Sequence, residues 1–205
     1  MDRQSGTVFV VDDDREVSES LCEIVKATGF SAVACPSAEN FLKTYQGDEP
    51  GCVILDMQLP GMNGLELQQS LAAHSTRIPV IMLTGHASVP MAVRAVKAGA
   101  FAFVEKPHCP RKLQTEVRAA VELDRRQREQ AAAHDACIRR LDSLTERERE
   151  VLQLLAEFCT PKGIASRLRI SLRTVDFHRA NLLEKMQMQS VPELIHFYLS
   201  LNSRS

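Results

Sequence analysis

The sequence predicts an α/β domain with a doubly wound parallel sheet, then a helical linker and a second, all-α domain of four helices. In the first part, short apolar runs alternate with amphipathic stretches, which is the pattern of βα units around a parallel sheet. The last part has helical periodicity only. A chain of 205 residues has room for two compact units, which we place at 1–121 and 142–205, with the linker at 122–141.

The composition is that of a soluble globular protein, with 44% hydrophobic and 25% charged residues. No apolar stretch approaches the ~20 residues of a membrane span, and no signal peptide is evident, so we expect a cytoplasmic protein without a membrane partner. The six cysteines lie far apart and form no C-x-x-C pair, which argues against zinc and for reduced thiols. A redox-sensing thiol at Cys109 or Cys137 stays open as an alternative.

Five apolar runs are the expected strands, at 7–11, 31–34, 51–55, 79–83 and 101–104. Helical patterns lie between them at 15–28, 37–45, 64–74 and 88–98. Five strands and about five helices in this length suit a flavodoxin-like (βα)5 domain. Ligands of such sheets bind at the carboxyl ends of the strands, beside the point where the strand order reverses.

The segment 110–141 is charged and helical in pattern. An apolar stripe runs through its first half and consists of Leu113, Val117, Ala120, Val121 and Leu123. Beyond Asp124 the stripe gives way to a polar, alanine-rich run. We interpret the segment as the last helix of the first domain continuing into a helical linker; a flexible tether is the alternative.

The second domain carries three helix-start signals. They are the capping box of Thr145 and Glu148, the N-cap Thr160 with Pro161 behind it, and the N-cap Ser171. A fourth helical pattern covers 191–201. The short turn at 169–171 between the second and third helices is typical of a helix-turn-helix.

Carboxylates follow two of the predicted strands. Asp12, Asp13 and Asp14 come directly after the first strand, and Asp56 ends the third. A parallel sheet brings them to one edge, where clustered carboxylates repel unless a cation lies among them. A hard, oxygen-liganded ion such as Mg²⁺ is the natural occupant.

A hydroxyl and an amine join this edge. Thr84 ends the fourth predicted strand and Lys106 follows the fifth. A carboxylate surrounded by acid, metal, hydroxyl and amine is suited to phosphoryl transfer, where catalysis is mostly positioning and charge neutralisation. Asp14 is more simply explained as a helix N-cap, and His86 as a loop residue.

Four motifs, VVDDD, LDMQLPGMNGLEL, TGHASVPMAVRAVKAGA and EKP, resemble those of bacterial receiver domains, and the whole chain resembles the NarL/FixJ family of response regulators. The resemblance implies Asp56 as phosphoacceptor and Asp12 and Asp13 as the acidic pair. It also implies Mg²⁺ held by Asp13, Asp56 and the Gln58 carbonyl. The implied switch and phosphoryl-contact residues are Thr84, Phe103 and Lys106, with a cis bond before Pro107. Ala87, Ser88 and His108 depart from the FixJ pattern beside the switch surface.

The stretch LTEREREVLQLLA and the K-x-I-A, R-T-V and H-R-A-N-L-L-E-K-M pattern after it resemble the LuxR-type DNA-binding domain. Ser171 would start the recognition helix. The implied DNA-facing residues are Lys162, Arg173, Thr174, Asp176, Phe177, Arg179 and Ala180. Basic residues outnumber acids between 160 and 185, which fits a polyanion, although a solvated surface has the same pattern.

Some details of this domain stay open. Asp176 either accepts a hydrogen bond from a cytosine amino group or pairs with Arg173 or Arg179. The last helix either forms a dimer contact or closes the core. Gly163 is expected to interrupt the second helix, and Phe158 stands where the family commonly has a glycine.

The function that these features predict is a phosphorylation-controlled transcription factor, and not an enzyme. Its expected partners are a sensor histidine kinase, promoter DNA, RNA polymerase and, once phosphorylated, a second copy of the chain. Dimerisation is expected through the face at 88–118. The alternatives are a phosphoacceptor that acts by protein contacts alone and a redox-modulated regulator.

Overall fold

The computed structural model describes residues 6–74, 76–85, 89–107 and 109–202. The chain divides into two compact units, Met1–Gln130 and Ala131–Ser205. His86, Ala87, Ser88 and His108, which the sequence raised as a loop residue and as departures from the family pattern, lie outside the described residues.

The first unit contains a five-stranded parallel sheet in the order β2-β1-β3-β4-β5. Its strands are β1 (Thr7–Val11), β2 (Ser31–Cys35), β3 (Gly51–Asp56), β4 (Val80–Thr84) and β5 (Ala102–Glu105). Its helices are α1 (Arg15–Lys26), α2 (Ala38–Thr44), α3 (Gly64–Ala73), α4 (Val89–Lys97) and the start of α5 (Pro110–Asp142). The doubly wound α/β prediction is confirmed, with boundaries within about two residues of those expected.

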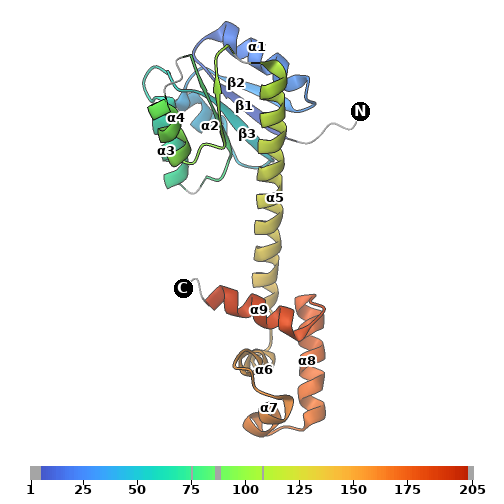
Figure 1. Ribbon diagram of the computed structural model, residues 1–205. Coiled ribbons are helices and arrows are strands. Elements are labelled where there is room, and N and C mark those ends of the chain that lie inside the picture. Colours follow the sequence, from blue (N-terminus) through green and yellow to red (C-terminus); the bar gives the residue numbers. More distant parts are fainter. Residues whose placement is uncertain (1–5, 75, 86–88, 108, 203–205) are drawn as a thin grey trace. The chain divides into compact units, whose positions relative to one another are not determined.

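Each face of the sheet is covered by its own helices, as Figure 1 shows. The side chains Leu21, Val25, Leu113 and Val117 of α1 and α5 pack on one face. Phe41, Leu67 and Ala95 of α2, α3 and α4 pack on the other. A sheet with both faces buried needs apolar residues throughout its strands, and the central strands β3 and β4 are buried at every position.

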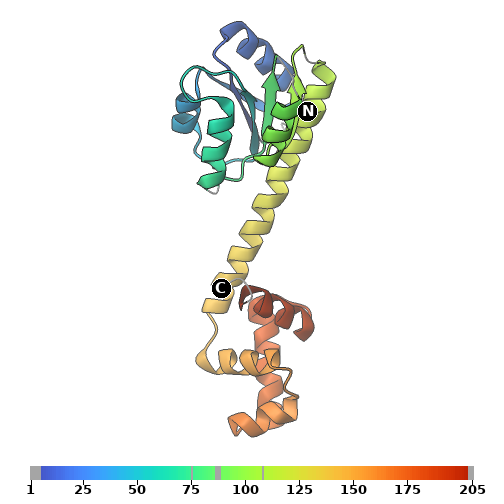
Figure 2. The ribbon, with the colours of Figure 1, turned by 60° about the vertical axis from the view of Figure 1, so that its left-hand side comes forward.

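The second unit consists of the end of α5 and four helices, seen from a second side in Figure 2. They are α6 (Glu146–Ala156), α7 (Pro161–Leu168), α8 (Leu172–Met186) and α9 (Val191–Asn202). The predicted N-caps form: Thr145 makes a complete capping box with Glu148, and Thr160 and Ser171 accept backbone N–H groups. The core of this unit includes Val151, Leu152, Ile164, Val175 and Leu182.

The helices agree only in part with what the sequence predicts. The predicted linker at 122–141 is helical, since α5 continues to Asp142. Leu123 is not part of the apolar stripe of α5: it is 37% exposed, and the last buried position of the stripe is the charged Asp124. None of the described helices is long and apolar enough to cross a membrane.

Candidate functional site

The strand register brings the predicted acidic residues together. Val11 of β1 pairs with Leu55 of β3, so the next residues, Asp12 and Asp56, lie level with each other at the carboxyl edge of the sheet. This edge is where the chain order reverses, since β2 and β3 lie on opposite sides of β1. Asp12 and Asp56 are both buried, with exposed fractions of 2% and 8%.

Lys106 bridges the two buried carboxylates. Its Nζ lies 2.8 Å from Asp12 Oδ2 and 3.2 Å from Asp56 Oδ2, although 94 and 50 residues separate it from them. Burial works to lower the pKa of Lys106, but the hydrogen bonds and charges of the two aspartates outweigh burial and raise it. The ammonium is therefore charged throughout the physiological range, and its position between two acids suits it to contact an anion bound there.

The acidic side chains fit a small divalent cation. Carboxylate oxygens of Asp12, Asp13 and Asp56 all lie within 4.8 Å of one another, and Asp13 is exposed while the other two are buried. Lys106 pairs with two of these three carboxylates, so the cluster keeps a surplus of negative charge. Oxygen donors with surplus negative charge and one open side match the preference of Mg²⁺. The first unit therefore contains an acidic pocket compatible with Mg²⁺.

Neighbouring backbone groups hold these side chains in place. Asp12 Oδ1 accepts from the Asp14 N–H at 3.0 Å, while Asp14 accepts from Glu16 and Val17 and caps α1, as the sequence suggested. The Gln58 N–H lies 3.4 Å from Asp56 Oδ1.

Gly64, the first residue of α3, allows that helix to approach Asp56. A Cβ at this position would lie 2.3 Å from the Asp56 carbonyl oxygen, a distance that a side chain cannot occupy. Asn63 starts α3 with a capping box to Glu66. The MNGLE part of the sequence motif therefore has a structural reason: it brings a helix start against the acidic edge.

The other predicted residues lie around the same edge. Thr84 ends β4 and is fully buried, and its carbonyl accepts from the Lys106 N–H at 2.7 Å. Phe103 is half-buried against the core on the α2–α4 face, opposite Met82 of β4. The Lys106–Pro107 peptide bond is cis, as predicted. A groove of about 480 Å³ opens beside Lys106; it is lined by Glu16, Val17, Ser20, Ile24, Lys106, Pro107 and Pro110.

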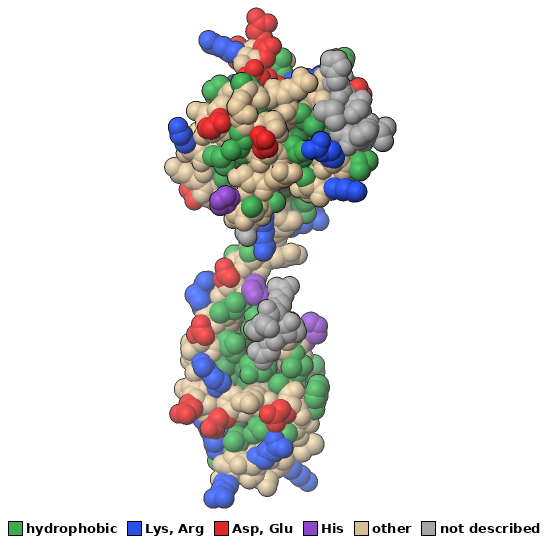
Figure 3. Space-filling model, turned by 90° about the vertical axis from the view of Figure 1, so that its left-hand side faces the viewer, with side chains coloured by type: hydrophobic (Ala, Val, Ile, Leu, Met, Phe, Trp, Pro, Cys, Tyr) green, Lys and Arg blue, Asp and Glu red, His purple; other side chains and the backbone are tan. Residues whose placement is uncertain are grey.

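In the helical unit, α8 presents one exposed face opposite the core. Val175 and Leu182 are fully buried, whereas Arg173, Phe177 and Ala180 are exposed and lie three or four residues apart, so they share the outer face. Phe177 is 61% exposed, a large value for an aromatic side chain on a well-packed helix. Lys and Arg side chains gather at the end of the unit that carries α7, at the bottom of Figure 3.

Two of the predicted DNA-facing residues bind each other. Arg179 Nη1 lies 3.1 Å from Asp176 Oδ1. Arg179 lies four residues after Val175 and three before Leu182, so it projects from the flank of the core side of α8, and its side chain is 31% exposed. This pair corresponds to the second of the two roles that the sequence left open for Asp176. Thr174 is half-buried and hydrogen-bonded to Ser171 at the helix start, and Lys162 is exposed on α7.

Gly163 does not interrupt the second helix, so that expectation was wrong. It is the third residue of α7, and its N–H donates to the capping Thr160 hydroxyl at 3.2 Å. A Cβ there would lie 3.3 Å from that hydroxyl, so the glycine relieves crowding within the cap. Phe158 has φ 58, the left-handed conformation that explains why a glycine is common at this turn, and it is 80% exposed.

Sequence reasoning missed a long-range pair that joins α6 and α8 in the helical unit. Lys185 of α8 donates to Glu148 Oε2 at 2.7 Å, and the same oxygen accepts from the Thr145 N–H and hydroxyl at 2.9 Å each. The capping box was visible locally, but nothing in a spacing of 37 residues indicated that a lysine would complete it.

The cysteines are all free in the structure. Cys22, Cys35 and Cys52 are buried, and burial raises the pKa of each of these thiols. Cys109 is exposed just before α5, where the backbone N–H groups of Lys112 and Arg111 lower its pKa.

Comparisons with known proteins bear on both units. Residues 8–118 match the family described as "Response regulator receiver domain", and residues 142–198 match "Bacterial regulatory proteins, luxR family". The chain is 39% identical over 196 residues to "Transcriptional regulatory protein FixJ" of Azorhizobium caulinodans, covering 96% of this chain and 93% of the relative. It is 37% identical to "Response regulator protein TmoT" of Ectopseudomonas mendocina, covering 95% and 89%.

Solved structures agree. A structure titled "Low Resolution Structure of Response Regulator StyR" has a TM-score of 0.82 and 38% identity, covering 95% of this chain and 98% of that one. Full-length FixJ from B. japonicum has a TM-score of 0.58 and 34% identity, covering 95% and 96%.

Proposed function

Since the chain belongs to the NarL/FixJ family of two-component transcriptional response regulators, we propose that it accepts a phosphoryl group on Asp56 and then binds promoter DNA through α8. The family is one of transcription regulators rather than enzymes, and we propose no substrate beyond the phosphoryl donor. The observation that carries the assignment of Asp56 is its position: it ends β3 beside Asp12, under the ammonium of Lys106.

The side chains of the pocket have separate roles in the proposed transfer. A carboxylate oxygen of Asp56 forms a bond to phosphorus while the bond from phosphorus to the donor breaks, and the leaving group keeps that electron pair. Lys106 then moves from its two acids to the phosphoryl oxygens. The Thr84 hydroxyl donates to the same oxygens, and Phe103 turns inward behind it.

The metal that we propose for the pocket is Mg²⁺, held by Asp13, Asp56 and the carbonyl of Gln58, with Asp12 beside them. Mg²⁺ bound there supplies charge neutralisation for the attacking carboxylate and the phosphoryl oxygens. The surplus of negative charge over the single lysine supports this proposal. The donor that we propose is a sensor histidine kinase.

DNA recognition is proposed for the start of α8, with its outer face in the major groove. Arg173 and Ala180 flank Phe177, whose exposed ring is suited to pack on a thymine methyl group. Thr174 lies at the helix start, and Lys162 on α7 supplies attraction to phosphate. Asp176 and Arg179 hold each other on the flank of this face, so Arg179 contacts phosphate rather than a base edge.

Phosphorylation is proposed to raise DNA affinity by dimerisation through α4, β5 and α5. Val93 and Val96 support this: they lie three residues apart on α4 and are 45% and 61% exposed. A dimer would place two recognition helices on adjacent half-sites. We also propose that the protein works in the cytoplasm and contacts RNA polymerase there, because it acts at promoter DNA.

The experiment is phosphoryl labelling with acetyl phosphate and Mg²⁺, followed by DNA binding. Asp56→Asn should lose both the label and the gain in DNA affinity, because the nucleophile is gone. Asp48→Asn, an exposed acid on the loop before β3, is the control and should behave as wild type. Undiminished Mg²⁺-dependent labelling of Asp56→Asn would remove the assignment.

A further inference from the structure

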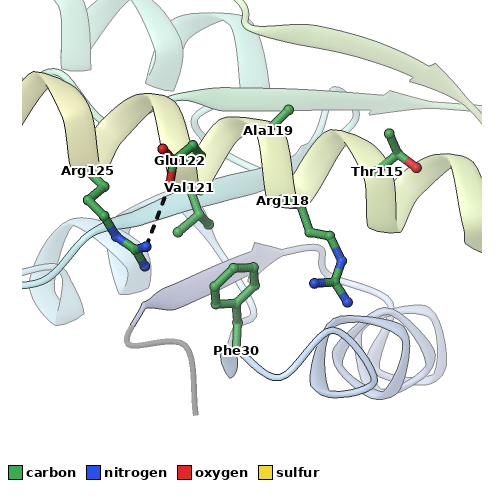
Figure 4. Close-up of a pocket in the computed structure, with 7 residues that line it drawn as sticks. All are labelled: Phe30, Thr115, Arg118, Ala119, Val121, Glu122 and Arg125. Atoms are coloured by element: carbon green, nitrogen blue, oxygen red, sulfur yellow. Dashed lines mark ion pairs between the residues drawn. The ribbon is translucent and has the colours of Figure 1, made fainter. Parts of the chain in front are cut away.

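The last buried position of α5 in the receiver is occupied by a charged side chain. The buried positions of the helix are Leu113, Val117, Ala120, Val121 and Asp124, a regular stripe in which the final place is taken by an acid. Val121, the last apolar member, points towards Phe30 in Figure 4. In the same view Glu122 and Arg125 pair with each other along the helix, at 3.6 Å.

Asp124 is 1% exposed and accepts two hydrogen bonds on one carboxylate oxygen. Its Oδ2 accepts from the Gly51 N–H at 2.9 Å and from Arg128 Nε at 2.7 Å. Gly51 opens β3 and is pressed against β1, since a Cβ there would lie 2.2 Å from the Thr7 carbonyl oxygen. The acid thus ties α5 to the backbone of a strand that packs closely against β1.

Arg128, one turn further on, makes a second tie. Its Nη1 donates to the Gly47 carbonyl at 2.6 Å, and its Nη2 lies 3.3 Å from the Tyr45 hydroxyl. The Tyr45 ring stacks on Phe41 and meets Phe9 edge-on, with centroids 5.4 and 5.6 Å away. Asp124 therefore connects the last receiver turns of α5 to β3, and Arg128 connects them to the loop before β3 and to Tyr45 of the aromatic core.

We propose that Asp124 and Arg128 are positioning residues that fasten α5 where it leaves the receiver, so that the linker helix transmits the receiver's phosphorylation state. The proposal rests on the proposed function of Asp56. A signal can pass along a helix only if the helix keeps a defined relation to the domain that sends it. Without the two ties, the last residue of α5 buried against the receiver would be Val121, and the turns that follow it up to the second unit would be free to fray or bend.

The test compares two arginine variants in the full chain. Arg128→Gln removes the contacts of Arg128 with the receiver. Arg126→Gln makes the same change of charge on the helix surface, where Arg126 pairs with Glu122 of the same helix at 2.8 Å. Amide hydrogen exchange of residues 122–130 should become about tenfold faster or more in Arg128→Gln and stay as wild type in Arg126→Gln. Asp124→Asn should change it in the same direction, because it loses the ion pair.

The functional readout is the ratio of DNA affinities with and without acetyl phosphate and Mg²⁺, on a duplex that the wild-type protein selects from a random pool. Labelling of Asp56 should be unchanged, while the ratio should fall about fivefold or more in Arg128→Gln and stay as wild type in Arg126→Gln. A merely structural role would lower thermal stability and leave the ratio at its wild-type value. That result, or unchanged exchange at 122–130, would overturn the proposal. A wild-type chain with a ratio of one would refute the proposed function itself, before any variant is compared.

Discussion

The acidic pocket of the receiver and the helix cap at Glu148 both bury acidic side chains, but they treat the negative charge in opposite ways. In the receiver, carboxylate oxygens of Asp12, Asp13 and Asp56 lie within 4.8 Å of one another, and the Lys106 ammonium pairs with Asp12 and Asp56. In the DNA-binding unit, a single acid, Glu148, is 3% exposed and meets the ammonium of Lys185 and two donors from Thr145.

The difference separates charge used for chemistry from charge used for folding. Crowded carboxylates with too few partners destabilise the fold, and they persist where a cation and an incoming anion complete them. A carboxylate with all its partners inside the protein has nothing left to bind, so its contribution is to join helices. The same isosteric change, acid to amide, should therefore have opposite effects on stability in the two units.

The larger effect is expected for Glu148→Gln. The amide keeps the shape, and its carbonyl oxygen can take the place of Oε2, but it carries no charge. The ion pair with Lys185 is lost and the bonds from Thr145 weaken, so we expect the helical unit to lose about 2 kcal/mol. Scanning calorimetry should show its transition about 10 °C lower. The control is Glu150→Gln on the same helix, whose pair with Arg147 is partly exposed and should matter little. Equal losses from both variants would remove the distinction between the two kinds of acid.

The pH dependence of stability gives a second test of the Glu148–Lys185 pair. Burial works to raise the pKa of Glu148, but Lys185 and Thr145 outweigh it and hold the pKa below the ordinary 4.5. A depressed pKa means that the charge stabilises the fold fully above about pH 4.5, and that this stability is lost as the pH falls through the lower, folded-state pKa. The gap in melting temperature between wild type and Glu148→Gln should be constant near neutral pH and shrink in acid. A gap that widened in acid would contradict the assignment.

In the acidic pocket of the receiver we expect the change from acid to amide to raise the melting temperature. Asp13→Asn removes one of three crowded charges without breaking the contacts of Lys106, so in a chelator the receiver should melt about 2–4 °C higher. Wild type should in turn gain more from added Mg²⁺ than the variant does, because binding stabilises the fold that holds the ligand. Asp48→Asn serves as the control. A lower melting temperature for Asp13→Asn in the chelator would show that the cluster is not under repulsion.

The sequence predicted those parts of the sites that follow from short range or from topology. The N-caps Asp14, Thr145 and Ser171 bind backbone groups within three residues, so each partner is close to its cap in the sequence. Lys106 meets Asp12 across 94 residues, yet this was expected because strand ends of a parallel sheet converge.

Partners that depend on packing could not be predicted. Asp124 looked like the place where the apolar stripe ended, and Leu123 like its last member, because hydrophobicity alone cannot show that a strand N–H needs an acceptor at that depth. Lys185 likewise looked like one more base of a basic segment, although its ammonium completes the Glu148 site. In both cases the missing information was which helix faces which partner.

The smallest effect is expected at the exposed acid on α8. Asp176 and Arg179 pair at 3.1 Å with side chains 57% and 31% exposed, so the pair should contribute less than about 1 kcal/mol to stability. Its consequence is electrostatic: Asp176→Ala frees Arg179 and removes a charge that repels phosphate. We expect a modestly higher affinity for every duplex, a steeper salt dependence and unchanged relative preferences among single-base operator variants at fixed salt. Glu184→Ala, an exposed acid two turns further along α8, controls for net charge. Preference relaxed at one base pair by roughly 1–3 kcal/mol would show instead that Asp176 reads a base, and that its bond to Arg179 opens on DNA.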